Sequence, residues 1–448
     1  MKKILLVVMI LLSWAFVAEA QDVGKQISNL VDAYAQLGKF NGSILVAAKG
    51  KVLLNKGYGF KDVKEKTVND ANTVYQIASV TKTFTSTLVL KLVEMEKIAL
   101  TDNVAKFYPG FPQGDSITIA QLLSHTSGIS DDSSADRVKN QPDSTEELFI
   151  ATLKARKLDF SPGTDWKYSN SGYILLGYII ERVLGMTYYE AIRTYIFQPL
   201  QMNASAFDFV GLASPDKATG YWAFPESDTV RPATLIDYRA PRAAGAIYST
   251  TGDLYTWHRG LQTGKLISLS LLDKAYTPVR NQYGLGWIID SVGTSRVVSH
   301  SGDIWGFKSE LTRVPADDIC IIQLNNIEDV DLRSITRKIL AILYHQPYQL
   351  PARNEIQLSQ PALREYEGDY LLRPGEWIKV RVENARLMAT TNRKQELYAQ
   401  RNGVFKIDDG YDQIVVTFHK GASGKVTELS FTIGGNKIIC KKRVGTPE

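Results

Sequence analysis

The chain has 448 residues, of which 44% are hydrophobic and 22% are charged, and its formal net charge is +5. This length is sufficient for more than one hydrophobic core, and the composition excludes a largely disordered protein. The small positive excess lies scattered over residues 352–448, so it does not indicate nucleic acid as a partner.

The N-terminal segment has the pattern of an export signal. Two lysines precede an apolar run at residues 4–17, and the small residues Ala18 and Ala20 follow that run. The run is short for a membrane span and the cleavage pattern follows it directly, so we predict a removed signal peptide over residues 1–20. We therefore expect a periplasmic or secreted bacterial protein without a stable membrane anchor.

Residues 21–345 are predicted to form one domain of strands and helices. The apolar segments 42–48 and 51–60 flank a Lys-Gly pair, which predicts a β-hairpin, and an apolar face spaced by four residues predicts a helix over 79–97. Later elements are predicted as a helical section over 118–200, strands over 283–289, 296–299, 309–314 and 319–325, and a helix over 331–345. This order implies an α/β (α+β) fold, in which an antiparallel sheet is assembled from both ends of the domain around a helical insert.

The C-terminal part of the chain has a different texture. Residues 346–361 contain three prolines and few long apolar runs, which predicts a linker. Residues 362–448 contain short alternating segments separated by glycine-rich turns. Regular short strands of this kind predict a separate, all-β, barrel-like domain.

The two cysteines, Cys320 and Cys440, both lie in apolar, strand-like runs. We expect buried thiols at both positions, although the sequence also permits a disulfide between the two halves of the chain. Neither cysteine has the spacing of a metal ligand, and the five histidines do not cluster. We therefore expect neither a metal site nor another cofactor.

Ser79 and Lys82 carry the most informative spacing in the chain. Three residues apart at the start of a predicted helix, they share one face. A neighbouring amine that takes its proton makes a serine hydroxyl a useful nucleophile, and partial burial can lower the pKa of the lysine. Taken alone, the same spacing also fits a helix-capping serine followed by a solvated lysine.

Tyr168, Ser169 and Asn170 form a second polar group, in a turn before a very apolar helical segment. A lysine cation close to Tyr168 is expected to favour the phenolate, which can then accept or relay a proton. The amide of Asn170 can hold a lysine and a substrate amide at once. A helix-capping turn is the alternative interpretation.

His300, Ser301 and Gly302 form the third group, on a strand-like run. A polar side chain followed by a glycine, which lets a ligand approach the backbone, is typical of a substrate-binding strand edge. A purely structural histidine is the alternative.

In this order, the three groups resemble the active-site signature of the penicillin-recognising serine enzymes, given for class A β-lactamases and penicillin-binding proteins as S-x-x-K, S-D-N and K-T-G. The Tyr-Ser-Asn motif resembles the branch that contains class C β-lactamases, D-alanyl-D-alanine carboxypeptidases, D-aminopeptidases and esterases. The resemblance covers most of residues 25–345, including the stretch Leu122–Ile129, where His125 is read as a loop-fixing residue. It implies a β-lactamase/transpeptidase-like fold with flanking helices.

The resemblance implies a role for each matching residue. Ser79 is the expected nucleophile, and Lys82 and Tyr168 are expected to relay protons. Asn170 is expected to orient Lys82 and the substrate, and the backbone N–H groups of Ser79 and Asp303 to hold the oxyanion. The sequence leaves open which of Lys82 and Tyr168 is the base, because their titrations are coupled.

His300 departs from the family pattern, since β-lactamases usually have lysine there. A neutral imidazole attracts a substrate carboxylate less well at pH 7, so this position is more similar to D-aminopeptidase and esterase relatives. We expect His300, Gly302 and Asp303 to line the substrate-binding edge.

The sequence therefore predicts an exported serine hydrolase that cleaves an amide or ester bond through an acyl-serine intermediate. The expected substrate is a small peptide, such as one containing D-amino acids, or an ester, or a peptidoglycan-derived compound. The alternatives are a carboxylesterase of the same fold and a non-catalytic protein that binds peptidoglycan or a partner. The sequence does not indicate an oligomeric state.

Overall fold

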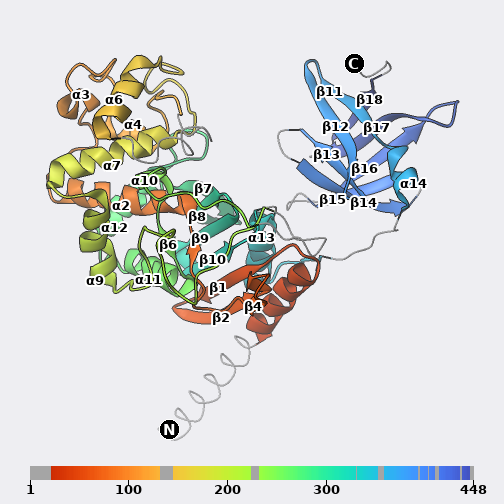
Figure 1. Cartoon of the computed structure of the whole chain (residues 1–448), viewed down its shortest axis with the longest axis horizontal. Helices are drawn as coiled ribbons and strands as arrows, with labels where there is room; N and C mark the ends of the chain where they lie inside the picture. Colours follow the sequence, from red (N-terminus) through yellow and green to blue (C-terminus); the bar gives the residue numbers. More distant parts are fainter. Residues whose placement is uncertain are drawn as a thin grey trace, which may run out of the picture. The chain divides into compact units, whose positions relative to one another are not determined.

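The computed structural model describes residues 22–131, 145–222, 232–328, 330–351, 358–391, 394–401, 403–408, 413–433 and 436–443. The chain divides into two compact units, Met1–Leu332 and Arg333–Glu448, and each is described by itself (Figure 1). The predicted signal peptide, residues 1–20, lies outside the described residues. The predicted domain boundaries, with a linker over 346–361, stay predictions.

The first unit is built on a six-stranded antiparallel sheet with the order β2-β1-β10-β9-β8-β7. Its strands are β1 (Gly42–Ala48), β2 (Lys51–Tyr58), β7 (Ile288–Val292), β8 (Ser295–Ile304), β9 (Phe307–Val314) and β10 (Ile319–Asn325). β1 pairs with both β2 and β10, so the sheet is assembled from both ends of the unit, as predicted. The predicted hairpin turns at Lys49 and Gly50, whose φ angles of 52° and 74° match the twist of the flanking strands.

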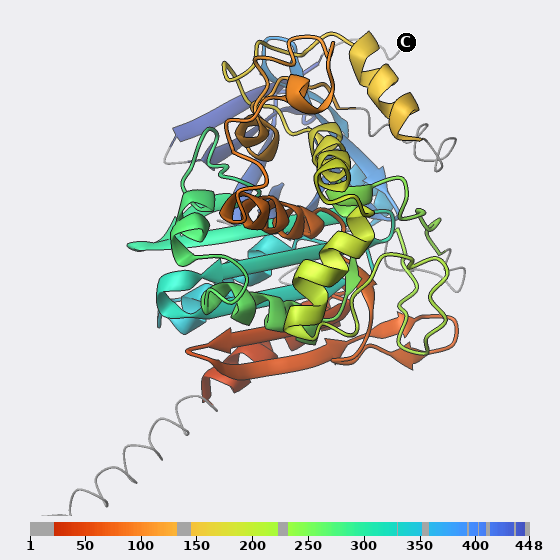
Figure 2. The same cartoon turned by 90° about the vertical axis from the view of Figure 1, so that its left-hand side faces the viewer.

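Helices gather on one face of this sheet, α2 and α7 among them (Figures 1 and 2). The helices of the unit are η1 (Ala78–Val80), α2 (Thr81–Glu94), α3 (Val104–Phe107), α4 (Ile119–Leu123), α6 (Glu146–Ala155), α7 (Asn170–Leu184), α8 (Tyr188–Ile192), η2 (Arg193–Phe197), α9 (Gln198–Leu200), α10 (Arg242–Gly245), α11 (Thr251–Gln262), α12 (Leu269–Ala275) and η3 (Pro315–Asp317), with residues 22–36 also helical. Two short strand pairs complete it, β3 (Phe60–Asp62) with β4 (Thr67–Val68) and β5 (Tyr75–Gln76) with β6 (Tyr248–Ser249). α13 (Leu332–Leu343) lies at the boundary of the units.

The helix α7 shows how the sequence determines one of these elements. The side chain of Ser169 caps its first turn by accepting the N–H of Gly172, and Gly185 ends it with a φ of 67°. All residues from Ser171 to Ile180 are buried, so the helix is apolar on every side because it is enclosed on every side. The very apolar helical segment after the second motif is therefore a buried helix.

The helix that was predicted over residues 79–97 has a different start. Ser79 belongs to the short turn η1, and the α-helix proper begins at Thr81. Ala78, the residue before Ser79, has a φ of 46°, which is uncommon for a residue with a side chain. The nucleophile candidate therefore lies on a strained turn and not within a regular helix.

The strand that was predicted over residues 283–289 is wrong in its position, because β7 begins at Ile288. Gly286 has a φ of 83°, and a Cβ atom on it would lie 2.5 Å from the Cβ of Ser86. The preceding residues therefore cross closely over α2 instead of extending along the sheet. In contrast, the strand predicted over 296–299 continues as β8 to Ile304 and includes the third motif.

The second unit is a closed barrel of eight antiparallel strands, preceded by α14 (Gln360–Arg364). The strands are β11 (Gly368–Arg373), β12 (Glu376–Glu383), β13 (Arg386–Thr390), β14 (Lys394–Arg401), β15 (Val404–Asp408), β16 (Gln413–Lys420), β17 (Val426–Ile433) and β18 (Asn436–Lys442). Tyr370 pairs with Lys442 where β11 meets β18, which closes the barrel. Tyr366, Phe405 and Phe418 pack in its core, with ring centroids 4.8 to 5.3 Å apart. The predicted all-β barrel is confirmed.

Both cysteines are free and buried, as expected from their apolar neighbours. Burial raises the pKa of Cys320 to about 12 and that of Cys440 to about 11, so neither thiol is reactive at neutral pH. Within the described residues, no helix has the length and apolar character needed to cross a membrane.

Candidate active site

Ser79 and Lys82 meet at the junction of η1 and α2. The Nζ atom of Lys82 lies 3.0 Å from the Oγ atom of Ser79, and it donates hydrogen bonds to Asn170 Oδ1 at 2.8 Å and to the backbone oxygen of Ala244 at 2.7 Å. Burial lowers the pKa of Lys82 from 10.5 to about 7, while the charge of Asp131 acts in the opposite direction. The lysine can therefore lose its proton near neutral pH and then accept one from the serine.

The sheet fixes the position of Ser79 from the other side. A Cβ atom on Gly302 of β8 would lie 2.2 Å from the oxygen of Ile77 and 3.0 Å from the nitrogen of Ser79, so only glycine permits this approach. Ser309 of β9 donates a hydrogen bond to the same Ile77 oxygen at 2.7 Å. The third motif is thus in direct contact with the turn that carries Ser79, as the predicted strand edge requires.

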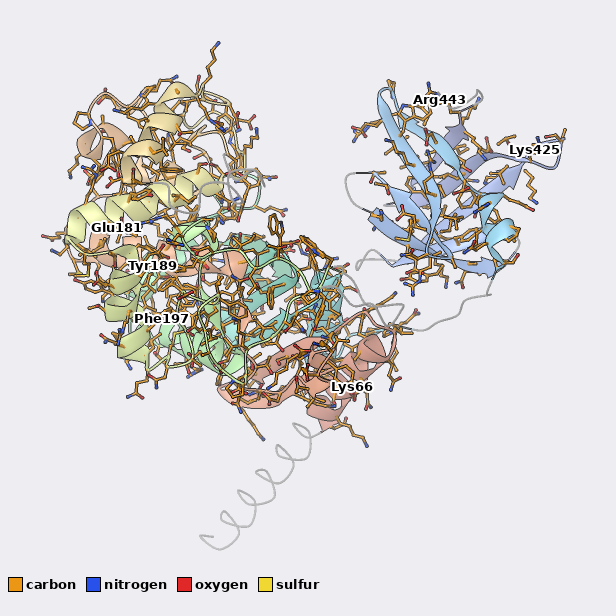
Figure 3. The ribbon with its side chains drawn as sticks, in the orientation of Figure 1. Lys66, Glu181, Tyr189, Phe197, Lys425 and Arg443 are labelled. Carbon is orange, nitrogen blue, oxygen red and sulfur yellow. The ribbon has the colours of Figure 1, made fainter. Side chains whose placement is uncertain are left out.

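The carbonyl group of Ala244 is held in place through Arg242, which begins α10. Arg242 donates a hydrogen bond to Glu181 at 2.8 Å, and its guanidinium carbon lies 5.6 Å from the ring centroid of Tyr189. Figure 3 shows Glu181 and Tyr189 close together on the helical layer. Thr85 also donates a hydrogen bond to the neighbouring Ala243 oxygen at 2.6 Å, which ties α10 to α2.

Tyr168 lies beside the lysine, with its ring centroid 4.8 Å from Lys82 Nζ. Burial raises the pKa of Tyr168, although a hydrogen bond with the Ser79 side chain opposes this shift. The expectation that the phenolate is favoured is therefore wrong, because desolvation of the buried ring raises its pKa and the charge of Asp131 adds to the shift. Tyr168 remains a phenol and can donate a proton.

His125 holds the second motif in position. Its Nδ1 atom accepts the backbone N–H of Ser169 at 3.1 Å, and its backbone oxygen accepts the N–H of Lys167 at 3.1 Å. Its ring packs against Tyr168 at a centroid distance of 4.3 Å. Burial lowers the pKa of His125 well below its usual range, so the ring stays neutral. This geometry agrees with a loop-fixing role.

His300 is buried, and both of its ring nitrogens have partners. Nε2 lies 2.9 Å from the hydroxyl group of Tyr283, and Nδ1 lies 2.7 Å from the backbone oxygen of Ser301. Nδ1 donates to that oxygen, so in the neutral ring Nε2 accepts from Tyr283. Burial and the nearby charge of Lys82 lower the pKa of His300 to about 3. The geometry thus gives His300 a role in holding the strand and offers no cation to a substrate.

The end of β8 provides an edge beside Ser79. β7 pairs with β8 only as far as Ser299, whereas β9 pairs with β8 up to Ile304. In the described part of the sheet, residues 300–304 therefore have a strand partner on one side only. Asp303 lies on this edge, and its exposed side chain is 3.7 Å from Lys308 Nζ.

The sequence interpretation missed three contributors to the site, namely Asp131, Tyr283 and the carbonyl group of Ala244. Asp131 accepts the backbone N–H of Asn170 at 3.0 Å, at the start of α7. Its position two residues after the stretch Leu122–Ile129 was the only signal in the sequence. A backbone carbonyl has no sequence signal at all, because every residue carries one.

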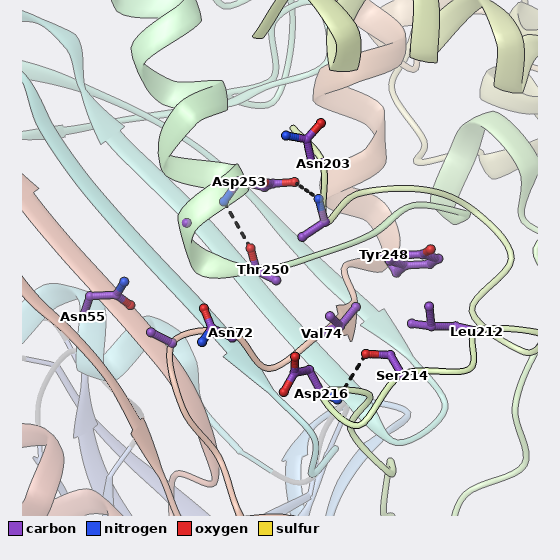
Figure 4. Close-up of a pocket in the computed structure, with 13 residues that line it drawn as sticks. Asn55, Asn72, Val74, Asn203, Leu212, Ser214, Asp216, Tyr248, Thr250 and Asp253 are labelled. Atoms are coloured by element: carbon purple, nitrogen blue, oxygen red, sulfur yellow. Dashed lines mark hydrogen bonds between the residues drawn. The ribbon is translucent and has the colours of Figure 1, made fainter. Parts of the chain in front are cut away.

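A cavity of about 520 Å³ lies in the first unit, away from Ser79 (Figure 4). It is lined by Asn55, Ala71, Asn72, Val74, Asn203, Ala204, Leu212, Ser214, Asp216, Tyr248, Thr250, Gly252 and Asp253. The carboxylate of Asp253 in this lining accepts hydrogen bonds from the N–H of Ala204 and the hydroxyl group of Ser205, both at 2.8 Å. None of the predicted site residues lines this cavity.

Comparison with known proteins agrees with this fold. A family model described as Beta-lactamase matches residues 27–344. The chain is also 31% identical over 399 residues to penicillin-binding protein 4* of Bacillus subtilis strain 168, which covers 82% of this chain and 87% of that protein. The molecule is a serine hydrolase of the β-lactamase-related class. The chain belongs to the Beta-lactamase family, which confirms the resemblance seen in its motifs.

Two solved structures extend the comparison. The octameric penicillin-binding protein homologue from Pyrococcus abyssi is 26% identical with a TM-score of 0.66, over 93% of this chain and 100% of that chain. The D-amino acid amidase from Ochrobactrum anthropi SV3, complexed with D-phenylalanine, is 21% identical with a TM-score of 0.64, over 72% of this chain and 99% of that chain. At that identity, the amidase shares the fold alone.

Proposed function

We propose that this protein hydrolyses an amide or ester bond of a small substrate through an acyl-Ser79 intermediate. The observation that carries the proposal is the distance of 3.0 Å between Lys82 Nζ and Ser79 Oγ, at a buried lysine whose pKa is lowered to about 7. The neutral amine takes the proton of Ser79 as its oxygen bonds to the substrate carbonyl carbon. The bond to the leaving group then breaks, and water releases the acid from the serine.

In this mechanism Lys82 is the base of the free enzyme. Its pKa lies near the working pH, whereas burial raises the pKa of Tyr168 and keeps the phenol protonated. Tyr168 donates its proton to the departing nitrogen or oxygen and recovers it from Lys82. We therefore propose Lys82, and not Tyr168, as the base.

The remaining predicted site residues bind the substrate in this proposal. The backbone N–H groups of Ser79 and Asp303 hold the oxyanion, since Gly302 brings β8 to within van der Waals distance of the turn at Ser79. Asn170 holds Lys82 through its oxygen and can donate to the acyl side of the substrate through its NH₂ group.

The surroundings of His300 favour substrates that have no carboxylate beside the scissile bond. Because this neutral, buried imidazole has partners on both nitrogens, it does not attract a carboxylate beside the scissile bond. We infer that D-aminoacyl amides, short D-amino-acid peptides and esters are turned over faster than penicillins. Comparing kcat/KM for a D-aminoacyl nitroanilide, a nitrophenyl ester and benzylpenicillin tests this order. Benzylpenicillin as the best substrate contradicts it, and ester turnover alone supports the carboxylesterase alternative.

Substitution of the nucleophile tests the proposed function itself. The variant Ser79→Ala is expected to lose ester hydrolysis and covalent labelling by a fluorophosphonate probe. The exposed Ser270, on α12, provides the matched control, because Ser270→Ala removes a hydroxyl group that donates to Ser268 and lies outside the site. Activity of Ser79→Ala equal to that of the native protein contradicts the mechanism and supports a non-catalytic binding protein.

Export is the last part of the proposal and rests on the pattern in residues 1–20. We expect the mature protein to begin at Gln21 in the periplasm or the medium. N-terminal sequencing of the protein from these fractions tests this expectation, and retention of residues 1–20 contradicts it.

A further inference from the structure

Asp131 connects two parts of the second motif with one carboxylate. Its Oδ1 atom accepts the backbone N–H groups of Asn170 at 3.0 Å and of Ser171 at 3.2 Å. Its Oδ2 atom lies 3.3 Å from the side-chain nitrogen of Asn170. The same carboxylate therefore touches the start of α7 and the side chain that reaches Lys82.

The orientation of the Asn170 amide matters because its two ends have opposite hydrogen-bonding character. The oxygen accepts from Lys82 Nζ at 2.8 Å, and the nitrogen faces Asp131. An ionised carboxylate only accepts hydrogen bonds, so it holds the donor end of the amide and leaves the acceptor end towards the lysine. We propose that Asp131 is a positioning residue that fixes the Asn170 amide and, through it, the Nζ atom of Lys82. This proposal rests on the proposed function, in which Lys82 is the base.

The loop that carries Asp131 is itself anchored to the segment before Tyr168. Gly128 accepts the N–H of Asp159 at 2.8 Å, and Thr126 accepts the N–H of Gly163 at 2.8 Å. His125, at the start of this loop, accepts the N–H of Ser169 through its ring. Backbone hydrogen bonds and the His125 ring therefore join the residues before Asp131 to the residues before Asn170.

A simple helix cap is the rival explanation for Asp131. A carboxylate near a helix N-terminus stabilises the helix, and Asp131 meets the first two N–H groups of α7 while Ser169 meets the N–H of Gly172. The variant Asp131→Asn separates the two roles. It keeps an oxygen for the backbone N–H groups but replaces Oδ2 by NH₂, which faces the NH₂ of Asn170. The Asn170 amide then turns, and Lys82 meets a donor instead of an acceptor.

The experiment compares native protein and Asp131→Asn in ester hydrolysis across pH. We expect kcat/KM to fall about tenfold or more, as is common when a group that orients the catalytic machinery is lost. We also expect the acid limb of the pH profile to move to lower pH, because the charge of Asp131 raises the pKa of Lys82. Thermal melting is expected to change little. A helix cap without a positioning role predicts a lower melting temperature and a native kcat/KM at the pH optimum, with the acid limb moved only by the lost charge. That result overturns the proposal.

Asp159→Asn is the matched control, because it removes a carboxylate from the neighbouring segment without touching Asn170. Asp159 pairs with Lys167 at 2.7 Å, and its backbone contact to Gly128 is unaffected by the substitution. We expect native kcat/KM and an unchanged acid limb for this variant. Should Asp131→Asn fail to fold, Asp131→Ser keeps a capping oxygen without the charge and is measured in its place. Active Ser79→Ala rejects the proposed function, whereas inactive Ser79→Ala with native-like Asp131→Asn rejects only the role of Asp131.

Discussion

Lys82 and Arg313 are two fully buried cations in the same unit, and their surroundings differ. The three oxygen partners of Lys82 are neutral, since they belong to a hydroxyl group, an amide and a backbone carbonyl group. Arg313, on β9, instead lies in a network that ends in the carboxylate of Asp318. Its hydrogen bonds run to His258 Nδ1 at 2.9 Å, to Gln262 Oε1 at 3.0 Å and to the hydroxyl group of Tyr276.

His258 is the link between Arg313 and Asp318. Because Nδ1 accepts from Arg313, the ring proton is on Nε2, which lies 3.1 Å from Asp318 Oδ1. Burial and the neighbouring guanidinium group lower the pKa of His258 to about 3. The imidazole therefore stays neutral. It connects Arg313 to Asp318 by one hydrogen bond on each ring nitrogen.

The difference shows two uses of a buried charge. A lysine with neutral partners is poised to lose its proton, and such a group is typical of a reaction centre. Arginine keeps its proton at every pH of interest, so it is suited to a network that must stay charged. Burial of a cation alone thus does not indicate a catalytic residue. The charge of the neighbouring groups distinguishes a catalytic cation from a structural one.

The largest expected effect is on activity, from Lys82→Met. This substitution removes the base while keeping an apolar side chain of similar length, and we expect kcat/KM for a nitrophenyl ester to fall about 10³-fold or more. The melting temperature is expected to stay the same or rise, because an unfavourably buried cation is gone. Ester turnover by folded Lys82→Met at the native rate would contradict the assignment of the base.

The same variant tests the comparison through pH. The pKa of Lys82 is about 7 in the folded protein and 10.5 without burial, so the unfolded chain binds more protons between these values. The free energy of unfolding therefore contains a contribution from Lys82 that rises from pH 7 towards pH 10.5. Denaturant titrations at several pH values are expected to be steeper in pH for the native protein than for Lys82→Met. Parallel curves would mean that the lysine is protonated throughout.

The second effect is on stability, from Arg313→Met. The substitution leaves His258, Gln262 and Tyr276 without their shared donor, and it separates Asp318 from its buried cation. We expect the free energy of unfolding to fall by about 3–5 kcal/mol, measured by denaturant titration. Activity per folded molecule is expected to remain native. Loss of activity without loss of stability would remove the distinction between the two cations.

The third effect is the acid sensitivity that His258 confers. Its pKa is about 3 in the folded protein against 6.5 in the unfolded chain, so unfolding takes up a proton in this range and stability falls as the pH is lowered through it. At pH 5, this contribution amounts to about 2 kcal/mol. His258→Gln keeps a donor and an acceptor without titrating, so the difference between the two proteins is expected to shrink or reverse on acidification.

The sequence predicted the residues around Ser79 and Lys82, but it did not predict the network of Arg313 and His258. The reason is physical. Ser79 and Lys82 are close in the chain, so the short turn η1 and the first turn of α2 bring them together. The motif residues Asn170 and Gly302 could be assigned because their resemblance to a family carries tertiary information. Arg313 lies on a predicted strand, but no local pattern in the sequence indicates that it contacts His258 across a helix–sheet interface.

The same limit applies to Asp131 and to the misplaced strand at residue 283. A hydrogen bond between segments that are far apart in the chain depends on how those segments pack, which hydrophobic periodicity does not describe. Gly286 lies in a sequence that is typical of a strand. Its positive φ, however, depends on the close approach of α2, which the sequence does not show. That an antiparallel sheet joins both ends of the unit was predictable, because it follows from the order in which strand-like and helical segments occur along the chain.

Arg259→Ala is expected to have the smallest effect, although Arg259 is the cation that touches Asp318 directly. Its NH1 atom lies 2.7 Å from Asp318 Oδ2, yet its side chain is 36% exposed, so water and salt screen the pair. We expect the free energy of unfolding to fall by about 0.5–1 kcal/mol, because Asp318 retains the N–H of His258. Denaturant titration in parallel with Arg313→Met separates contact from burial. If Arg259→Ala costs as much as Arg313→Met, direct pairing with the carboxylate determines stability, and the buried relay through His258 does not.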